Sequence, residues 1–326
     1  MTVQEQALSV ARPRISFGLI VGLALFAVLA ALPFVAEVWG GAWLTSLAVR
    51  AMILAIVAIS LDLLMGQGGL VSFGHSAFVA IGAYATGILL TEGVYEMAVI
   101  LPAALAAAAL FAVASGAVVM RTSGVSFIMI TLAFGQMVYF ALGSLAQYGA
   151  DDGLTLWSAP DFLGTAWLTH DTGVYVGVLA VLIGTWALVH AIVGSRFGRV
   201  LRAARQNPTR VAAMGYSVFR YRLVAYVIAG MIAALAGVLW ATHAEFVSPS
   251  LGAWQRSGDL IVMVVLGGLA TRNGALIGAL FFVLIEEVLS SITHDWRLIF
   301  GPLLILIALH ARGGLAGLLD RVRGPA

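Results

Sequence analysis

Residues 17–36 read FGLIVGLALFAVLAALPFVA, a run of twenty residues without a charged side chain. A helix rises about 1.5 Å per residue, so a run of this length crosses the hydrocarbon core of a bilayer. The run lacks a clear small-x-small cleavage site, which favours a retained membrane span over a signal peptide. Nine further apolar runs follow, at residues 43–65, 71–90, 98–120, 126–146, 173–193, 223–243, 255–270, 275–291 and 297–311.

The composition indicates the same fold class. Of the 326 residues, 62% are hydrophobic and only 10% are charged, whereas a soluble domain has about 25% charged residues. The alternating pattern of outer-membrane barrel strands is absent. Lipid is therefore the expected solvent for most of the surface, and we predict an all-α integral membrane protein with about ten transmembrane helices.

The residue types that are missing exclude several kinds of chemistry. The chain has no cysteine, and its seventeen basic residues are all arginine. A Walker A nucleotide site and a pyridoxal-phosphate enzyme both require lysine. The chain has no H-E-x-x-H motif, no ordered Ser–His–Asp set and no carboxylate cluster suited to a metal. We therefore predict no catalytic residues, no cofactor, no metal site and no nucleic-acid partner, because arginines in this pattern determine topology.

The arginines are distributed unevenly between the gaps that separate the apolar runs. When the N-terminus is placed in the cytoplasm, fourteen of the seventeen arginines fall in cytoplasmic segments, and only Arg50, Arg256 and Arg297 fall outside. An excess of arginine in cytoplasmic loops sets the orientation of membrane proteins. We expect both termini in the cytoplasm, with an N-terminal tail at 1–16, a membrane domain at 17–311 and a C-terminal tail at 312–326.

One cytoplasmic loop, residues 194–222, has a more specific pattern. Arg196, Arg199, Arg202 and Arg205 recur every third residue and share one broad helical face, while apolar residues occupy the opposite face. This spacing predicts an amphipathic helix.

A second, shorter helix is expected directly after it, from Pro208 to Met214. Asn207 suits the N-cap, Pro208 suits the first turn, and Gly215 suits the left-handed residue that ends a helix. A short capped helix beneath a membrane bundle fits a groove on another protein, which is the interpretation that we favour. The alternative is an arginine-rich loop that only sets orientation and contacts anionic lipid.

Two glycine-rich stretches interrupt the apolar pattern, at residues 65–70 and 267–274. Paired breaks in corresponding positions are typical of transporters built from two repeated halves. The alternative is that they reflect the abundance of glycine, of which the chain has 37 residues.

Polar side chains within apolar runs are costly and are therefore candidates for function. Asp62 and His75 flank the first glycine-rich break. Ser72 is placed to cap the helix that follows, so that its free N–H groups face a bound carboxylate. The alternative is that Asp62 caps or pairs locally, with His75 or with an inner arginine.

Other polar residues of the apolar runs favour structural roles. For Thr131, Gln136 and His190, a hydrogen bond between helices is expected rather than substrate contact. Glu286 and Glu287 lie toward the outer end of the ninth run. They are expected either to receive a binding protein or to be ordinary solvated residues.

Several motifs resemble those of the branched-chain amino acid permeases of ATP-binding-cassette importers, of the LivM type. They are GQGGLVSFGHSAF at 66–78 with GAY at 82–84, RTSG at 121–124 leading into TLAFGQ at 131–136, and the loop 198–215. The resemblance runs over most of residues 45–320. It implies a type II-like importer fold, in which the loop between the sixth and seventh spans supplies the coupling helix for an ATPase subunit. Two departures concern that loop: Val211 precedes the alanine pair, and Thr209 and Arg210 stand where related permeases carry acidic residues.

The resemblance and the loop pattern together assign candidate site residues. Those expected to couple to the ATPase are Arg202, Arg205, Asn207, Pro208, Val211, Met214 and Gly215. Those expected along the substrate path are Gly68, Ser72, His75, Thr131 and Gln136.

The implied partners are ATP-binding-cassette subunits, a homologous permease subunit that forms a heterodimer, a periplasmic or extracellular substrate-binding protein, membrane lipid and a small-molecule substrate. The expected location is the inner (cytoplasmic) membrane of a prokaryote.

The function that this implies is a multi-pass permease subunit that imports branched-chain or related small amino acids by alternating access. Related permeases also serve urea, short amides and other small organic acids. A secondary transporter driven by an ion gradient is the first alternative, although it needs buried carboxylates at a midplane cavity. A membrane enzyme or a scaffold is the second alternative.

Overall fold

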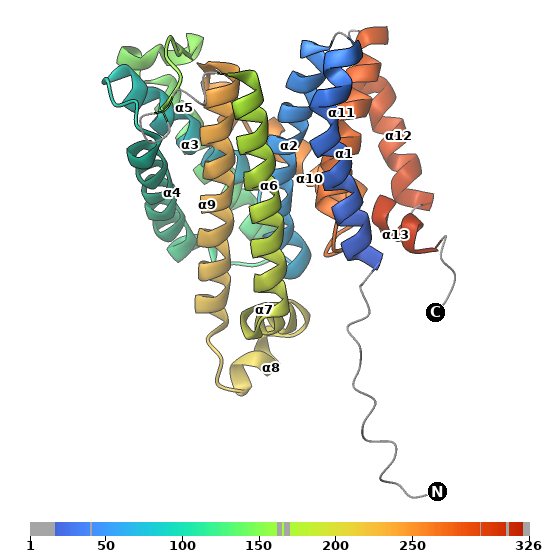
Figure 1. Ribbon diagram of the computed structural model, residues 1–326. Helices are drawn as coiled ribbons and strands as arrows, with labels where there is room; N and C mark the ends of the chain where they lie inside the picture. Colours follow the sequence, from blue (N-terminus) through green and yellow to red (C-terminus); the bar gives the residue numbers. More distant parts are fainter. Residues whose placement is uncertain are drawn as a thin grey trace, which may run out of the picture.

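The computed structural model describes residues 17–39, 41–161, 165, 170–293, 295–310 and 313–321, which form a helical bundle (Figure 1). The long helices are α1 (Phe17–Trp39), α2 (Ala42–Asp62), α3 (His75–Thr91), α4 (Met97–Val119), α5 (Val125–Gly143), α6 (Asp171–Gly194), α9 (Val218–Ala244), α10 (Trp254–Gly267), α11 (Gly274–Ile292) and α12 (Trp296–His310). The shorter helices are η2 (Leu63–Gln67), η3 (Ala146–Tyr148), η4 (Ala150–Asp152), α7 (Arg196–Gln206), α8 (Pro208–Ala213), η6 (Pro249–Gly252) and α13 (Gly314–Arg321). Two short strands, β1 (Leu154–Thr155) and β2 (Phe246–Val247), pair antiparallel.

The predicted all-helical membrane class is confirmed, whereas the number of membrane spans is not. Among the described residues, seven helices are long and apolar enough to cross a membrane: α1, α2 continued by η2, α4, α5, α6, α9 and α11. A helix also stands at each remaining predicted span, but α3, α10 and α12 have only 17, 14 and 15 residues. The number of ten spans and the location of the termini therefore stay predictions.

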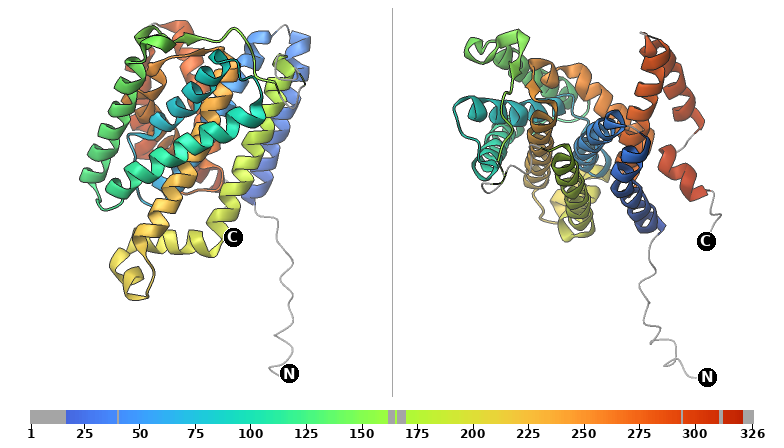
Figure 2. Two further views of the ribbon diagram at one scale, coloured as in Figure 1. Left: turned by 90° about the vertical axis from the view of Figure 1, so that its left-hand side faces the viewer. Right: turned by 45° about the horizontal axis from the view of Figure 1, so that its top comes forward.

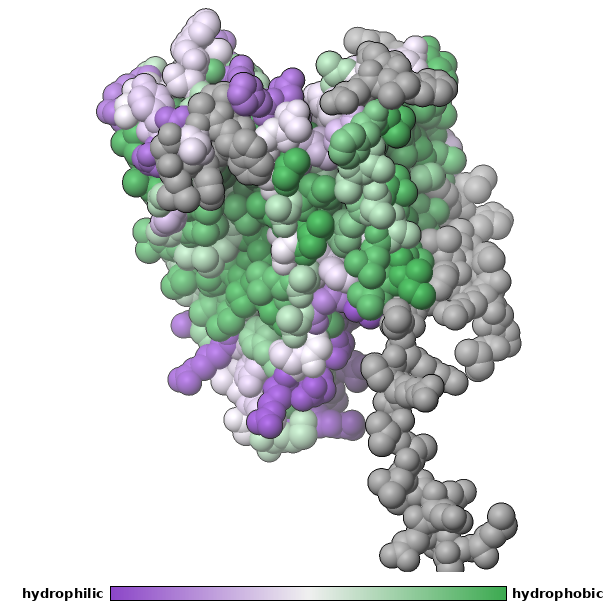
Figure 3. Space-filling view, viewed as in Figure 1, coloured by the Kyte–Doolittle hydropathy of each residue, from purple (hydrophilic) through white to green (hydrophobic). Residues whose placement is uncertain are grey.

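Helix α2 forms the centre of the bundle. It contacts α1, α6, α9, α10 and α11, and its side chains from Ala55 to Asp62 are all buried. A helix that is apolar on all sides is expected in such a position, because it has no face to present to water. Lipid-facing positions lie on the outer helices: large hydrophobic side chains of α1, α4, α5 and α6 are exposed. Figure 3 shows hydrophobic side chains around the middle of the molecule on the face seen in Figure 1.

The two ends of the bundle differ. Helices α7 and α8 lie at one end, and the β1–β2 ribbon lies at the other (Figure 1). Arg121 stacks over the ring of Phe219, which is in the first turn of α9 directly after α8. Arg50 pairs with Glu286 toward the opposite end. Arg121 and Arg50 therefore lie toward different ends of the bundle.

The predicted tails lie mainly outside the described residues. Residues 1–16 are not described, and of residues 312–326 the structure describes Gly313 and α13. Helix α13 packs against α10 and α11. The predicted loop 194–222 also ends earlier than expected, because α9 already begins at Val218.

Candidate functional site

The short helix α8 has the local structure that the sequence predicts. The side chain of Asn207 caps it by accepting a hydrogen bond from the backbone amide of Arg210 at 2.9 Å. Pro208 is its first residue. Gly215 follows the helix with a φ of +86°, a conformation that glycine adopts without steric cost. The cap, the helix and the left-handed glycine are therefore confirmed.

Helix α8 projects from the bundle beyond α7, as Figure 2 shows. Pro208 and Arg210 are exposed, and Met214, just after the helix, has 59% of its surface exposed. Val211 is the exception, since only 2% of it is exposed. Its side chain anchors α8 and is not available to a partner without rearrangement, whereas its neighbours are.

The two arginines of α7 that the sequence assigned to the coupling surface bind within the chain. Arg205 donates a hydrogen bond through Nη1 to the carbonyl oxygen of Gly66, and Arg202 donates through Nη1 to Oε1 of Gln67 at 3.2 Å. Gly69 has a φ of +70°, and a Cβ there would lie 2.7 Å from Cγ of Arg205. Helix α7 is therefore joined to the first glycine-rich break, residues 65–70, which includes the end of η2.

The two glycine-rich breaks lie against each other. Oδ1 of Asp62 accepts a hydrogen bond from the backbone amide of Ala270 at 2.9 Å. A Cβ at Gly66 would lie 2.0 Å from that Oδ1 and 2.7 Å from the amide nitrogen. Ala270 has a φ of +58°, a conformation that costs a non-glycine residue roughly 1–2 kcal/mol. Asp62 thus holds a strained residue of the second break that is distant in the sequence, and not a local group, His75 or an inner arginine as one sequence interpretation expected.

Three of the five residues predicted along the substrate path, Ser72, His75 and Thr131, lie where the segment before α3 approaches α5. The hydroxyl of Thr131 accepts a hydrogen bond at 3.2 Å from the amide of Phe73, which lies in the non-helical segment before α3 and not on a second helix as expected. Nε2 of His75 lies 2.8 Å from the hydroxyl of Ser60 on α2. Gly68 lies toward Leu201 of α7 instead.

Ser72 does not cap the helix that follows it, so that prediction is wrong. Helix α3 begins at His75 with Gly74 in the capping position and no side-chain cap. Among the described residues, neither the hydroxyl of Ser72 nor Nδ1 of His75 has a hydrogen-bond partner, although both are buried. Buried polar groups are usually paired, and exceptions mark places of functional interest. Gln136 is half-buried on α5.

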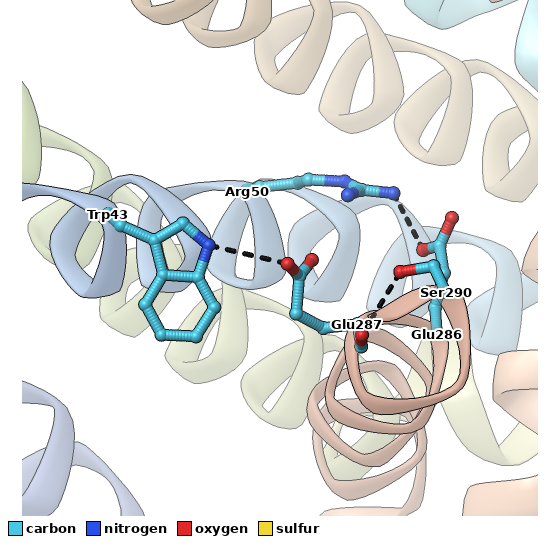
Figure 4. A network of polar contacts seen from close by, with 5 residues as sticks. All are labelled: Trp43, Arg50, Glu286, Glu287 and Ser290. Carbon is cyan, nitrogen blue, oxygen red and sulfur yellow. Dashed lines mark hydrogen bonds and ion pairs between the residues drawn. The ribbon is translucent and has the colours of Figure 1, made fainter. Parts of the chain in front are cut away.

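A polar network joins α2 to α11 near the end opposite α8 (Figure 4). Arg50 forms an ion pair with Glu286 at 2.6 Å. The indole nitrogen of Trp43 donates a hydrogen bond to Oε1 of Glu287 at 3.3 Å. Both glutamates are therefore engaged within the chain.

Sequence reasoning missed the partners Ala270, Gln67 and Ser60. Ala270 and Gln67 interact with residues 208 and 135 positions away, and Ser60 with one 15 positions away, beyond the reach of a helical turn, so no local pattern indicates the pairing. The one available signal is the break at residues 267–274, because glycine-rich stretches interrupt helical hydrogen bonding and leave backbone amides without helical partners. Within the described residues, no three histidines, aspartates or glutamates gather to hold a metal.

The chain is similar to a known family and to several known proteins. A family model described as the branched-chain amino acid transport system permease component matches residues 43–309. The high-affinity branched-chain amino acid permease LivM of Escherichia coli is 26% identical over 294 residues, covering 82% of this chain and 69% of that protein. The autoinducer 2 import permease LsrC of an Enterobacter species is 32% identical over 252 residues, covering 73% and 69%. The ribose import permease RbsC of E. coli is 26% identical over 270 residues, covering 78% and 80%.

No solved structure gives a significant match. The family match covers most of the chain, from the beginning of α2 to the end of α12. With its long apolar helices and its projecting capped helix, this chain belongs to the family of branched-chain amino acid transport system permease components.

Proposed function

We propose that this chain is the membrane-spanning subunit of an ATP-driven importer for branched-chain or related small amino acids. Separate ATP-binding-cassette subunits hydrolyse ATP, and an external binding protein delivers the substrate. A homologous permease completes the path as a heterodimer in the inner membrane of a prokaryote. The relatives named for amino acids, autoinducer 2 and ribose support import as the general activity.

The observation that carries the proposal is the exposed helix α8. Its cap and its terminal glycine define its two ends, and the surface that includes Arg210 and Met214 faces away from the bundle. A short helix presented in this way fits a groove on a soluble partner. We assign this surface to the ATPase subunits.

The contacts of α7 supply a physical route from α8 to the membrane helices. Helix α7 leads directly into α8, and its Arg205 is bound to the backbone of η2. Asp62, the last residue of α2, is bound to the second break. A displacement of α8 by the ATPases therefore pulls on both breaks, where backbone hydrogen bonding is weakest and the helices bend most easily.

The proposal is tested by disrupting the exposed surface of α8. We expect Met214→Arg, and deletion of residues 208–214, to abolish association with the ATPase subunits in a detergent pull-down. The reason is that a charge enters an apolar contact in the first variant and the contact is removed in the second. Purified complexes reconstituted in vesicles should then lose ATP-dependent uptake of radiolabelled leucine.

Gln147→Arg is the matched control, because Gln147 is exposed on η3 at the opposite end of the bundle. It should leave ATPase association unchanged. Retained association in both α8 variants contradicts the docking assignment. Uptake driven by an ion gradient in vesicles that contain this chain alone contradicts the ATP-driven mechanism and favours a secondary transporter.

A further inference from the structure

A cavity of about 380 Å³ lies beside α7, between α2, α6 and the beginning of α11. This volume lies in the range of sites that hold small organic molecules. None of the five residues predicted along the substrate path lines it. Its polar wall contains Asp62, Gln67, His190, Arg202 and Arg272. The remaining wall is mostly aliphatic and includes Ile59, Val189, Val193 and Leu276.

The carboxylate of Asp62 lies at the buried end of the cavity. Only 8% of the residue is exposed, and its Oδ1 accepts a hydrogen bond from the Ala270 amide at 2.9 Å. In the part of the chain that the structure describes, the only ion pair closer than 4.0 Å joins Arg50 to Glu286. A buried carboxylate without a cationic partner is costly. A ligand that brings a cation to Asp62 is therefore favoured.

Two guanidinium groups line the same cavity. Arg202 is half-buried and donates a hydrogen bond to Oε1 of Gln67 at 3.2 Å. Arg272 is exposed, and its guanidinium lies 5.7 Å from the ring centroid of Trp186. Neither arginine has an ionic partner among the described residues. A ligand with only one kind of charge leaves the opposite charge of the cavity unpaired, so the wall favours a small zwitterion.

The side of the cavity toward α1 is closed. Asn273 donates a hydrogen bond through Nδ2 to the carbonyl oxygen of Gly18 on α1, and its Oδ1 accepts one from the indole of Trp186 on α6 at 3.0 Å. The aliphatic part of Arg272 packs against Gly18 as well.

The open side faces the end of the bundle where α7 and α8 lie (Figure 1). The wall on α6 extends to the last residue of that helix, and α7 supplies a further wall. Exposure rises from Asp62 through Arg202 to Arg272, and an exposed guanidinium faces water and not hydrocarbon. A ligand therefore enters from this end, which the arginine distribution predicts to be cytoplasmic.

We propose that this cavity binds a free aliphatic α-amino acid, such as leucine, from the end of the bundle that carries α7. The ammonium donates to Asp62, and the carboxylate accepts charge-assisted hydrogen bonds from Arg202 and Arg272. The side chain lies against the aliphatic wall. Phosphoethanolamine carries the same pair of charges, but it has no branched apolar group to cover that wall. The inference rests on the proposed function for the choice of amino acid, since such an importer delivers its product to this side.

The test measures binding of radiolabelled leucine to the purified full chain by equilibrium dialysis in detergent, without ATPase subunits. Unlabelled leucine should displace the label about tenfold better than leucinamide, which has no carboxylate, or isocaproate, the analogue without the amino group. The reason is that each analogue loses a hydrogen bond between charged groups. Phosphoethanolamine should compete more weakly than leucine, because it leaves the aliphatic wall uncovered.

Two variants test the assigned contacts through the choice of competitor. Asp62→Asn keeps an oxygen for the Ala270 amide but removes the negative charge. Leucine affinity should fall about tenfold, and isocaproate should then compete as well as leucine. Arg272→Gln should also lower leucine affinity about tenfold, and it should narrow the difference between leucine and leucinamide. A general loss of stability lowers binding without changing these preferences.

Arg196→Gln is the matched control, since Arg196 is an exposed arginine of α7 that does not line the cavity. It should bind leucine as the wild type does. Absence of leucine binding by the wild type overturns the inference, as does an affinity that is unchanged in both Asp62→Asn and Arg272→Gln. Displacement by phosphoethanolamine as effective as by leucine indicates a headgroup site and also overturns it.

The same measurements separate this inference from the proposed function. If reconstituted complexes import leucine while the chain alone does not bind it, only the inference about the cavity fails. If the chain binds leucine with the expected dependence on Asp62 and Arg272 while the complexes import none, only the proposed function fails.

Discussion

Asn207 separates two helices that differ in their contacts with the bundle. Its side chain caps α8, while α7 on its other side is tied to the bundle through Arg205. The sequence predicted this cap correctly because capping depends on residues within one helical turn. It did not predict the strained Ala270 or the carboxylate that binds its amide, since these partners are 208 residues apart.

The cap of α8 gives a prediction at the scale of one residue. Asn207→Ala removes the acceptor for the Arg210 amide and should destabilise α8 by about 1 kcal/mol. The affinity for the ATPase subunits should fall roughly fivefold, as measured by titrated pull-down. Asn207→Asp retains an acceptor oxygen and serves as the control. Equal affinity in the alanine variant and the wild type would show that the cap has no part in docking.

At the scale of elements, α3 and α9 cross with their backbones in close approach. A Cβ at Gly82 of α3 would lie 2.0 Å from the carbonyl oxygen of Ala234, and a Cβ at Gly237 of α9 would lie 2.0 Å from that of Val79. Small residues allow helix backbones in a membrane to approach in this way. The apolar runs indicated both helices, but their pairing depends on which glycines face each other.

This crossing predicts that replacing its glycines by alanine lowers stability more than the same replacement elsewhere. Gly82→Ala and Gly237→Ala should each destabilise the protein by about 1–3 kcal/mol, because the methyl group collides with backbone that cannot move aside. Thermal unfolding in detergent measures the loss as a lower midpoint. Gly184→Ala on α6 is the control, since no atom lies within 4 Å of its added Cβ. A midpoint for the α3 and α9 variants that matches the control would disprove the close contact.

At the scale of the whole molecule, α7 connects the exposed helix α8 to the place where the two glycine-rich breaks meet. The first break belongs to the first half of the sequence and the second break to the last quarter, yet Asp62 and Ala270 join them. Arg205 adds α7 to the same junction. A force applied at α8 therefore reaches both segments through two hydrogen bonds.

This connection predicts uncoupling when Arg205 is changed. Arg205→Gln should leave α8 and ATPase association intact but remove a charged hydrogen bond to the Gly66 carbonyl. We expect the leucine imported per ATP hydrolysed in vesicles to fall by about tenfold. Arg196→Gln removes an arginine of the same helix that has no such contact and should keep the wild-type ratio. If Arg205→Gln imports as much leucine per ATP hydrolysed as the wild type, the contact of α7 with Gly66 takes no part in transport.

The sequence by itself determined the membrane class, the positions of the long helices, and the cap and terminal glycine of α8. These features depend on hydrophobicity over a window of residues or on contacts within one turn, so they can be recognised locally. Only the tertiary structure decided that Arg205 and Arg202 bind the first break, that Ser72 is not a cap, and that Arg50 pairs with Glu286. Such partners are set by which helices become neighbours, and the apolar runs are too alike in composition for their pattern to specify that choice.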